Sequence, residues 1–170
     1  LGRAETEAFL AALPEGKALT EPWQPQPLPA GEALVVPTPV NYVGKGANLY
    51  SLGYQYHGSV HVIAHLLRTS YLWERVRVQG GAYGAFCSFD RLSGGFVFVS
   101  YRDPNLLATL DIYDSAAAFL RSSSITDEEL TKSIIGAIGD IDTYLLPDAR
   151  GLISMQRRLN GVSDASRQQM

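Results

Sequence analysis

The segment from Arg75 to Gly84 (Arg-Val-Arg-Val-Gln-Gly-Gly-Ala-Tyr-Gly) combines residue types that can take part in catalysis. Arg77 offers five hydrogen-bond donors in a rigid planar fork, and the hydroxyl of Tyr83 is a neutral donor. Such donors can hold peptide carbonyl oxygens and stabilise an oxyanion that develops in a transition state. Gly80 and Gly81 permit a sharp or left-handed turn that would bring the guanidinium and the phenol close together.

The same spacing also fits a purely structural interpretation. Arg75 and Arg77 would complement the negative dipole end of a helix that ends in this segment. The two glycines would form the C-terminal cap of that helix, and Tyr83 would pack at the start of a strand. Spacing by itself leaves both interpretations open and favours the structural one.

Three histidines suggest a metal site, because His57, His61 and His65 are four residues apart. On a helix they would lie along one side, where neutral imidazoles at i and i+4 can share a zinc ion. The inverted zinc-protease motif also needs a glutamate before its second histidine to activate water. Val60 and Ala64 occupy those places, so we interpret the histidines as residues of a helix surface or boundary and predict no metal site in this chain.

Apolar spacing predicts the elements that would position these residues. Residues 33–43 fit an extended strand interrupted by prolines, and residues 58–74 fit a largely buried helix. Residues 83–90 and 96–101 fit the two strands of a β-hairpin, because Leu92-Ser93-Gly94-Gly95 between them supplies turn chemistry.

Two longer helices are predicted after the hairpin. Asp103 and Pro104 have the residue types of a helix cap and a first helical position, and apolar residues follow at helical spacing. Thr126 to Glu129 fits a capping box that opens a helix running to about Tyr144, and a weaker helical pattern closes the chain. This order predicts an α+β fold, a two-layer sandwich with helices packed on one face of a mostly antiparallel sheet.

Prolines divide the chain. Seven of the nine lie between Pro14 and Pro39, so residues 1–32 are interpreted as the end of a preceding helix and a proline-rich linker. Residues 33–170 would then form the α+β domain. Since the chain begins at Leu1 with neither an initiator methionine nor a leader, we interpret it as a piece of a longer protein.

Composition excludes several classes of protein. With 46% hydrophobic and 18% charged residues, the chain can bury a core and is not a disordered charged segment. A net charge of −3 provides no basic field, so we predict no nucleic-acid partner and no membrane partner. The single cysteine, Cys87, allows neither an intrachain disulfide nor a cysteine-based zinc site.

Five stretches carry a family resemblance. They are Val40–Lys45, Leu72–Val78, Gly80–Gly84, Ser100–Asn105 and Asp140–Asp142. Together they resemble the C-terminal half of the presequence proteases, most closely the plant or algal organellar type, and the likeness covers essentially the whole chain. Those enzymes belong to the pitrilysin-like inverzincin family of zinc metallopeptidases. The resemblance implies four related α+β domains in two halves that close around a peptide chamber.

The resemblance also implies roles for particular residues. In such enzymes the zinc ligands and the catalytic glutamate lie in the N-terminal half, so this segment would hold no zinc. The matching arginine and tyrosine are Arg77 and Tyr83, which would reach into the active site, bind the substrate backbone and stabilise the transition state. The family spacing, with two residues between the arginine and Gly-Gly-Ala-Tyr, selects Arg77 over Arg75. Gly80 and Gly81 would join them as substrate-binding residues.

The implied function is that of a fragment of an organellar zinc metalloendopeptidase that degrades cleaved targeting presequences and other short unstructured peptides. Its location would be the mitochondrial matrix, the chloroplast stroma or both. Its partners would be the N-terminal half of the same polypeptide and peptide substrates, and the isolated segment is expected to be inactive. Two alternatives stay open: a peptide-binding module without chemistry, and a structural domain like the respiratory-chain core proteins of the same fold. Arg77 beside Gly-Gly-Ala-Tyr argues against the structural domain, which has no need of that pair.

Overall fold

A computed structural model describes residues 2–16, 24, 26 and 29–165, and the chain divides into two compact units, Leu1–Val36 and Pro37–Met170. The first unit contains helix α1 (Arg3–Ala11), none of whose residues is buried. The backbone N–H of Gly2 donates to Glu5 Oε2 at 2.7 Å at the start of this helix. Most of the predicted proline-rich linker falls on residues 17–23, 25, 27 and 28, which lie outside the described residues.

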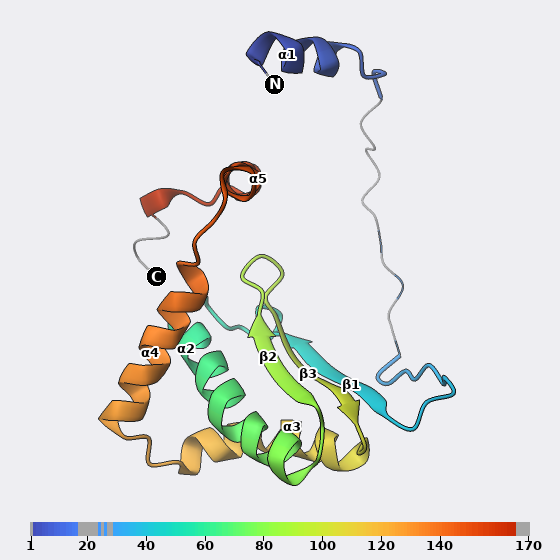
Figure 1. Ribbon diagram of the computed structural model, residues 1–170, viewed down its shortest axis with the longest axis vertical. Coiled ribbons are helices and arrows are strands. Elements are labelled where there is room, and N and C mark those ends of the chain that lie inside the picture. Colours follow the sequence, from blue (N-terminus) through green and yellow to red (C-terminus); the bar gives the residue numbers. More distant parts are fainter. Residues whose placement is uncertain (1, 17–23, 25, 27–28, 166–170) are drawn as a thin grey trace. The chain divides into compact units, whose positions relative to one another are not determined.

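The second unit is built on a three-stranded antiparallel sheet (Figure 1). Its strands are β1 (Asn41–Asn48), β2 (Gly84–Phe89) and β3 (Gly95–Asp103), in the order β1-β3-β2. The predicted hairpin of β2 and β3 is confirmed. Asp90 closes its turn, since its carboxylate accepts from the Ser93 hydroxyl and from the backbone N–H groups of Leu92 and Ser93. These bonds, the one from the Ser93 hydroxyl first, hold the pKa of Asp90 below its usual value.

Strand β1 begins later than the sequence predicts. The expected strand at 33–43 is wrong for residues 33–40, because Pro37 and Pro39 lack the N–H that a sheet ladder needs and pairing starts only after them. From Asn41 onward β1 pairs with β3 along its whole length. Gly46 permits this close pairing, since a Cβ there would lie 2.8 Å from Val97 Cγ1.

The helix predicted at 58–74 is confirmed and continues to Gln79 in an unusual form. It starts as helix α2 (Ser59–Leu66) and becomes π-helical in η1 (Leu67–Tyr71) and η2 (Trp73–Gln79). At the transition, the hydroxyls of Thr69 and Ser70 donate to main-chain carbonyls four residues earlier, a contact that bends helices. Leu67, Leu72 and Val76 from this segment are 0–2% exposed and form the middle of the core.

After the sheet come helices α3 (Leu107–Ser122), α4 (Asp127–Ile141) and α5 (Pro147–Leu159). The predicted capping box of α4 is confirmed, because Thr126 Oγ1 accepts from the N–H of Glu129 while the Glu129 carboxylate accepts from the N–H of Thr126. The hydrogen bonds that the backbone N–H and the hydroxyl of Thr126 donate to the Glu129 carboxylate hold the pKa of Glu129 below its usual value. Helix α4 ends at Ile141, three residues before the predicted end.

Asp103 does not cap α3 as the sequence predicts. It is the last residue of β3 and is fully buried, and α3 begins four residues later without a side-chain cap. Its carboxylate accepts hydrogen bonds from Ser100 Oγ at 2.6 Å, Thr109 Oγ1 at 2.8 Å and the Asn105 N–H at 2.9 Å. The buried carboxylate therefore fastens the corner between β3 and α3.

Helix α2, the π-helical segment and α3 pack on the sheet, and the mixture of helices with an antiparallel sheet confirms the α+β prediction. In β2, Ala85, Cys87 and Phe89 are buried while Phe86 and Ser88 are exposed. Helix α2 and the π-helical segment pack on β2, α3 packs on β1, and α4 packs on α2. The cluster of buried residues consists of Val43, Ala64, Leu67, Tyr71, Leu72, Val76, Ala82, Ala85, Cys87, Tyr113 and Ala116.

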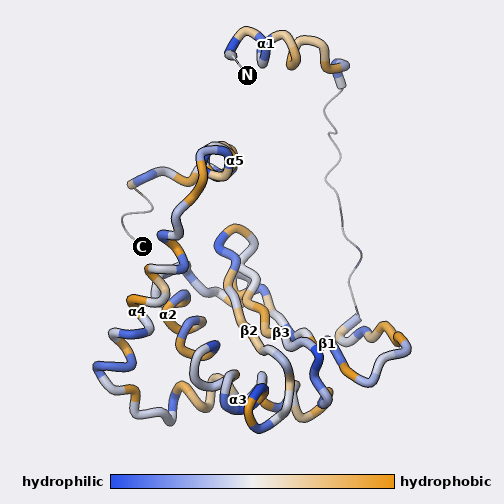
Figure 2. Tube along the Cα trace, in the orientation of Figure 1, coloured by the Kyte–Doolittle hydropathy of each residue, from blue (hydrophilic) through white to orange (hydrophobic). Residues whose placement is uncertain are grey.

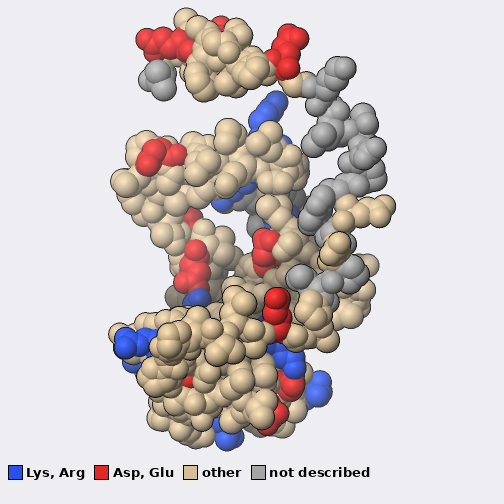
Figure 3. Space-filling view, turned by 90° about the vertical axis from the view of Figure 1, so that its right-hand side faces the viewer, with Lys and Arg blue, Asp and Glu red and all other residues tan. Residues whose placement is uncertain are grey.

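The surface of this unit is mixed in character. Figure 2 shows hydrophobic positions recurring among hydrophilic ones along α4, and Ile135 and Ile138 of that helix are more than half exposed. On the face drawn in Figure 3, acidic and basic side chains are scattered over a larger uncharged area. Among the described residues, no helix has both the length and the apolar character needed to cross a membrane.

Candidate functional site

Arg77 and Tyr83 line one cavity of about 510 Å³ in the second unit. Its other lining residues are Val40, Gly81, Ala82 and Arg102. The cavity therefore brings together the end of η2, the glycine turn and the C-terminal end of β3. Of the two predicted substrate-binding glycines, Gly81 is among the lining residues and Gly80, the C-cap residue of η2, precedes it in the chain.

The side chain of Arg77 is supported by an aromatic ring. Its guanidinium carbon lies 4.0 Å from the ring centroid of Trp73, one turn earlier in η2. A guanidinium at this distance is attracted to the π face of the ring. The contact restricts the orientations of the Arg77 side chain, which is exposed.

The two glycines form the turn that joins η2 to β2, and each is required for a different reason. Gly81 has φ +79°, a conformation that side chains rarely adopt. A Cβ on Gly80 would lie 2.5 Å from the carbonyl oxygen of Val76. The side-chain amide of Asn105 donates to the Gly80 carbonyl at 2.6 Å, so the turn is fastened to the corner that Asp103 holds.

Tyr83 lies immediately before β2 and presents its ring at the surface, with 60% of the residue exposed. Its ring packs edge-on against Tyr101, with the centroids 5.1 Å apart. Its backbone N–H donates to the carbonyl oxygen of Arg102 at 3.4 Å. Tyr83 is thus held by β3 through both its main chain and its ring.

Arg102 is the residue of this site that the sequence analysis missed. Its guanidinium carbon lies 5.8 Å from the ring centroid of Tyr83, and it lines the same cavity as Arg77. Its φ is +50°, although it is not a glycine. The sequence shows only that a cation directly precedes Asp103-Pro104. It does not show the backbone conformation that places Arg102 in the cavity.

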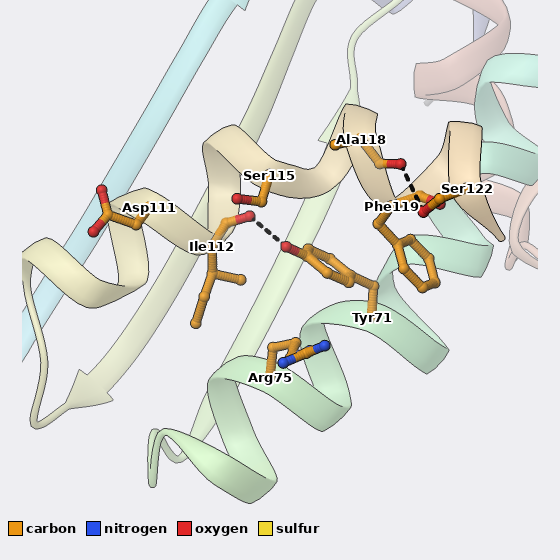
Figure 4. Close-up of a pocket in the computed structure, with 8 residues that line it drawn as sticks. All are labelled: Tyr71, Arg75, Asp111, Ile112, Ser115, Ala118, Phe119 and Ser122. Carbon is orange, nitrogen blue, oxygen red and sulfur yellow. Dashed lines mark hydrogen bonds between the residues drawn. The ribbon is translucent and has the colours of Figure 1, made fainter.

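Arg75, the competing cation, lines a different cavity of about 390 Å³ between the π-helical segment and α3 (Figure 4). There the hydroxyl of Tyr71 donates to the Ile112 carbonyl at 2.8 Å, and burial raises the pKa of Tyr71. Asp111 belongs to the same lining. The structure therefore separates Arg75 from Arg77, as expected for residues two apart on a helix.

The cavity with Arg77 suits oxygen atoms that carry negative charge. Its lining holds two guanidinium groups and one phenol, and none of its lining residues is acidic. Carbonyl oxygens and a developing oxyanion are the ligands such donors bind. The lining residues therefore offer hydrogen-bond donors for binding and for stabilising negative charge, and none of them is a histidine, a carboxylate or a thiol.

The three histidines each contact a different partner. His61 Nε2 lies 3.1 Å from the hydroxyl of Tyr56, His57 Nδ1 lies 2.9 Å from Ser59 Oγ, and His65 Nδ1 lies 3.0 Å from the Arg68 guanidinium. Burial, assisted by the charge of Arg91, lowers the pKa of His61. Across the described part of the chain, no three His, Cys, Asp or Glu side chains group closely enough to hold a metal ion, and the residues present therefore do not fit a zinc site.

Comparison with known proteins adds an independent line of observation. The family model of the PreP C-terminal domain matches residues 31–170. Presequence protease 1, chloroplastic/mitochondrial, of Arabidopsis thaliana is 54% identical over 163 residues, which cover 94% of this chain. Protein HypA of Clostridium perfringens is 40% identical over 78% of the chain, and the mitochondrial presequence protease of Xenopus tropicalis is 33% identical over 76%. The chain spans 15%, 14% and 12% of the lengths of these three proteins, respectively.

Proposed function

The chain belongs to the family of presequence protease C-terminal domains, and on that premise we propose that it is a segment of an organellar metalloendopeptidase. The enzyme would degrade cleaved targeting presequences and other short unstructured peptides in mitochondria, chloroplasts or both. The names of the relatives from Arabidopsis and Xenopus support this location. The observation that carries the proposal is the cavity shared by Arg77 and Tyr83.

The segment would contribute binding groups and leave the metal to another part of the enzyme. The described residues offer no metal ligand set, so the zinc that the family implies would be held by the N-terminal half of the same polypeptide, together with the catalytic glutamate. By itself the segment would cleave nothing. Its partners would be that N-terminal half and the peptide substrate.

Each residue of the cavity has a distinct proposed role. The guanidinium of Arg77, held against Trp73, would donate to backbone carbonyl oxygens of the bound peptide. The hydroxyl of Tyr83 would donate to the oxygen on which negative charge develops. Gly80 and Gly81 have no side chains, so they would let the peptide backbone approach the turn closely. Removing one oxyanion donor typically costs about 2.7–4 kcal/mol, or about 10²–10³ in rate.

A second candidate is a peptide-binding module without a catalytic contribution. It is favoured by one observation, that the cavity lining contains neither a base nor a nucleophile. The two candidates differ in what the hydroxyl of Tyr83 does. In a binding module its loss weakens peptide binding, whereas in the enzyme its loss slows turnover.

Steady-state kinetics on the full-length enzyme test the proposal. Tyr83→Phe should lower kcat with little change in KM, because an oxyanion donor acts mainly in the transition state. Arg77→Ala should lower kcat further and also raise KM, since it binds carbonyl oxygens in the ground state too.

Arg75→Ala is the matched control, because Arg75 lines the other cavity. As a helix-end cation it should cost at most about 1 kcal/mol of stability and leave turnover nearly intact. The proposal fails if Tyr83→Phe behaves like the wild type, or if Arg75→Ala is as damaging as Arg77→Ala while all variants keep the same melting temperature.

A further inference from the structure

Arg102 occupies an irregular position in β3. Asn41 pairs with Asp103 and the next residue, Tyr42, pairs with Tyr101, so Arg102 is an extra residue without a partner in β1. It is also the one non-glycine residue with positive φ, at +50°, in the part of the chain that the structure describes. Such a β-bulge redirects a side chain and is often found beside an active site.

We propose that Arg102 is a positioning residue for Tyr83. The bulge turns the main chain so that the carbonyl of Arg102 accepts from the Tyr83 N–H, at 3.4 Å. The same residue places its guanidinium 5.8 Å from the centroid of the Tyr83 ring, within the range of cation–π attraction. Arg102 thereby holds Tyr83 at two points, its backbone and its ring, and fixes the direction of the phenol hydroxyl in the cavity.

The positive φ is informative because arginine is poorly suited to it. Glycine, asparagine and aspartate adopt left-handed conformations far more readily. A glycine at position 102 would permit the same bulge with less strain but would offer no guanidinium. Arg102 thus combines a strained backbone with a cation that lies near the ring of Tyr83. Strained backbone conformations are often found at functional sites.

The inference rests on the proposed function, because positioning the hydroxyl of Tyr83 affects kcat only if that hydroxyl stabilises a transition state. Its first test is Arg102→Gly in the full-length enzyme. This variant keeps the bulge and the carbonyl that holds the Tyr83 N–H, and it removes the side chain together with its guanidinium. We expect kcat to fall about three- to thirtyfold, the range that a cation–π contact supplies, with KM nearly unchanged and no loss of melting temperature. Arg102→Lys retains a cation and should recover most of kcat.

The matched control is Arg91→Gln. The guanidinium of Arg91 also lies over an aromatic ring, 4.8 Å from the centroid of Tyr56, but it does not line the cavity. This variant loses a similar contact elsewhere in the same unit, so its kcat should equal that of the wild type.

A double-mutant cycle shows whether Arg102 acts through Tyr83. In the Tyr83→Phe background the hydroxyl is gone, so adding Arg102→Gly should change kcat less than about twofold. A second readout does not depend on turnover. With 3-fluorotyrosine at position 83, the fluorine resonance should shift and sharpen in Arg102→Gly, because the ring gains freedom, and should stay unchanged in Arg91→Gln.

The outcomes separate this inference from the proposed function. If Tyr83→Phe is impaired but Arg102→Gly is not, or if their effects on kcat multiply, the positioning role is wrong and the proposed function stands. If Arg102→Gly raises KM and leaves kcat unchanged, Arg102 binds substrate directly and positioning is again overturned. If the wild-type enzyme cleaves no peptide, or Tyr83→Phe matches it, the proposed function fails and the positioning role fails with it.

Discussion

Replacing Gly80 with alanine perturbs the candidate site through the main chain and leaves the side chains of Arg77 and Tyr83 unchanged. The added Cβ would lie 2.5 Å from the carbonyl oxygen of Val76 and 3.1 Å from that of Arg75. Since ordinary contact requires about 3.5 Å, the main chain must move by about 1 Å. Both close neighbours are main-chain atoms, so no side-chain rotation relieves the overlap, and we expect a loss of about 1–3 kcal/mol in the free energy of unfolding.

The displacement would reach the cavity. The N–H of Gly81 donates to the carbonyl oxygen of Arg77 at 3.0 Å, and Tyr83 follows two residues later, so the turn couples Gly80 to both donors. A misplacement of about 1 Å in a group that positions substrate can cost about 10²-fold in rate. We therefore expect kcat/KM of the full-length Gly80→Ala enzyme to fall by about two orders of magnitude.

Thermal unfolding and steady-state peptide cleavage measure the two effects of Gly80→Ala. Gly139→Ala in α4 is the matched control, because nothing lies within 4 Å of its would-be Cβ. Alanine is the better helix former by about 0.8–1.0 kcal/mol, so this control should raise the melting temperature and leave kcat/KM unchanged. A Gly80→Ala enzyme with wild-type melting temperature and kcat/KM would refute the reasoning about the turn.

Two further predictions concern a surface ion pair and a buried thiol. The hydrogen bond from Arg68 holds the pKa of Asp140 in the folded protein below its ordinary value of 3.8. The pair therefore contributes its full stabilisation above pH 3.8. This contribution is lost as the pH falls through the lower pKa of the folded state. Asp140→Asn should thus flatten the dependence of the melting temperature on pH in the acid range; an unchanged acid slope would contradict this. Burial raises the pKa of Cys87 to about 12, so this thiol is protonated and inaccessible in the native protein at pH 8. Iodoacetamide at pH 8 should therefore label it only after unfolding. Rapid labelling of the native protein would contradict this prediction.

The elements that the sequence predicted well are those fixed by local interactions. The capping box of α4 depends on Thr126 and Glu129, which are three residues apart, and the hairpin depends on a turn that Asp90 closes within its own loop. The segment with Arg77 and Tyr83 was also identified from sequence, although spacing by itself did not distinguish a catalytic pair from a helix cap. The structure shows the two residues lining one cavity.

The features that escaped prediction depend on contacts between distant parts of the chain. Asp103 has the residue type of a helix cap, but its carboxylate is buried at the corner between β3 and α3. It is accommodated there because the hydroxyls of Ser100 and Thr109 donate hydrogen bonds to it. Arg102 lines the cavity because pairing with β1 leaves it unpartnered in a bulge, and a one-dimensional pattern does not record that register. The π-helical form of residues 67–79 likewise follows from main-chain geometry that apolar spacing does not reveal.

The π-helical segment gives the helix a way to absorb a change in chain length before Arg77. A π-helix fits more residues into each turn than an α-helix, so removing one residue between Leu67 and Trp73 allows a wide turn to revert to the α form. In a helix that stays α throughout, each residue contributes about 100° of rotation, and a single deletion would swing every following side chain by that angle. Because the reverting turn takes up the missing residue, Arg77 keeps its direction toward the cavity that it shares with Tyr83 when the segment is one residue shorter.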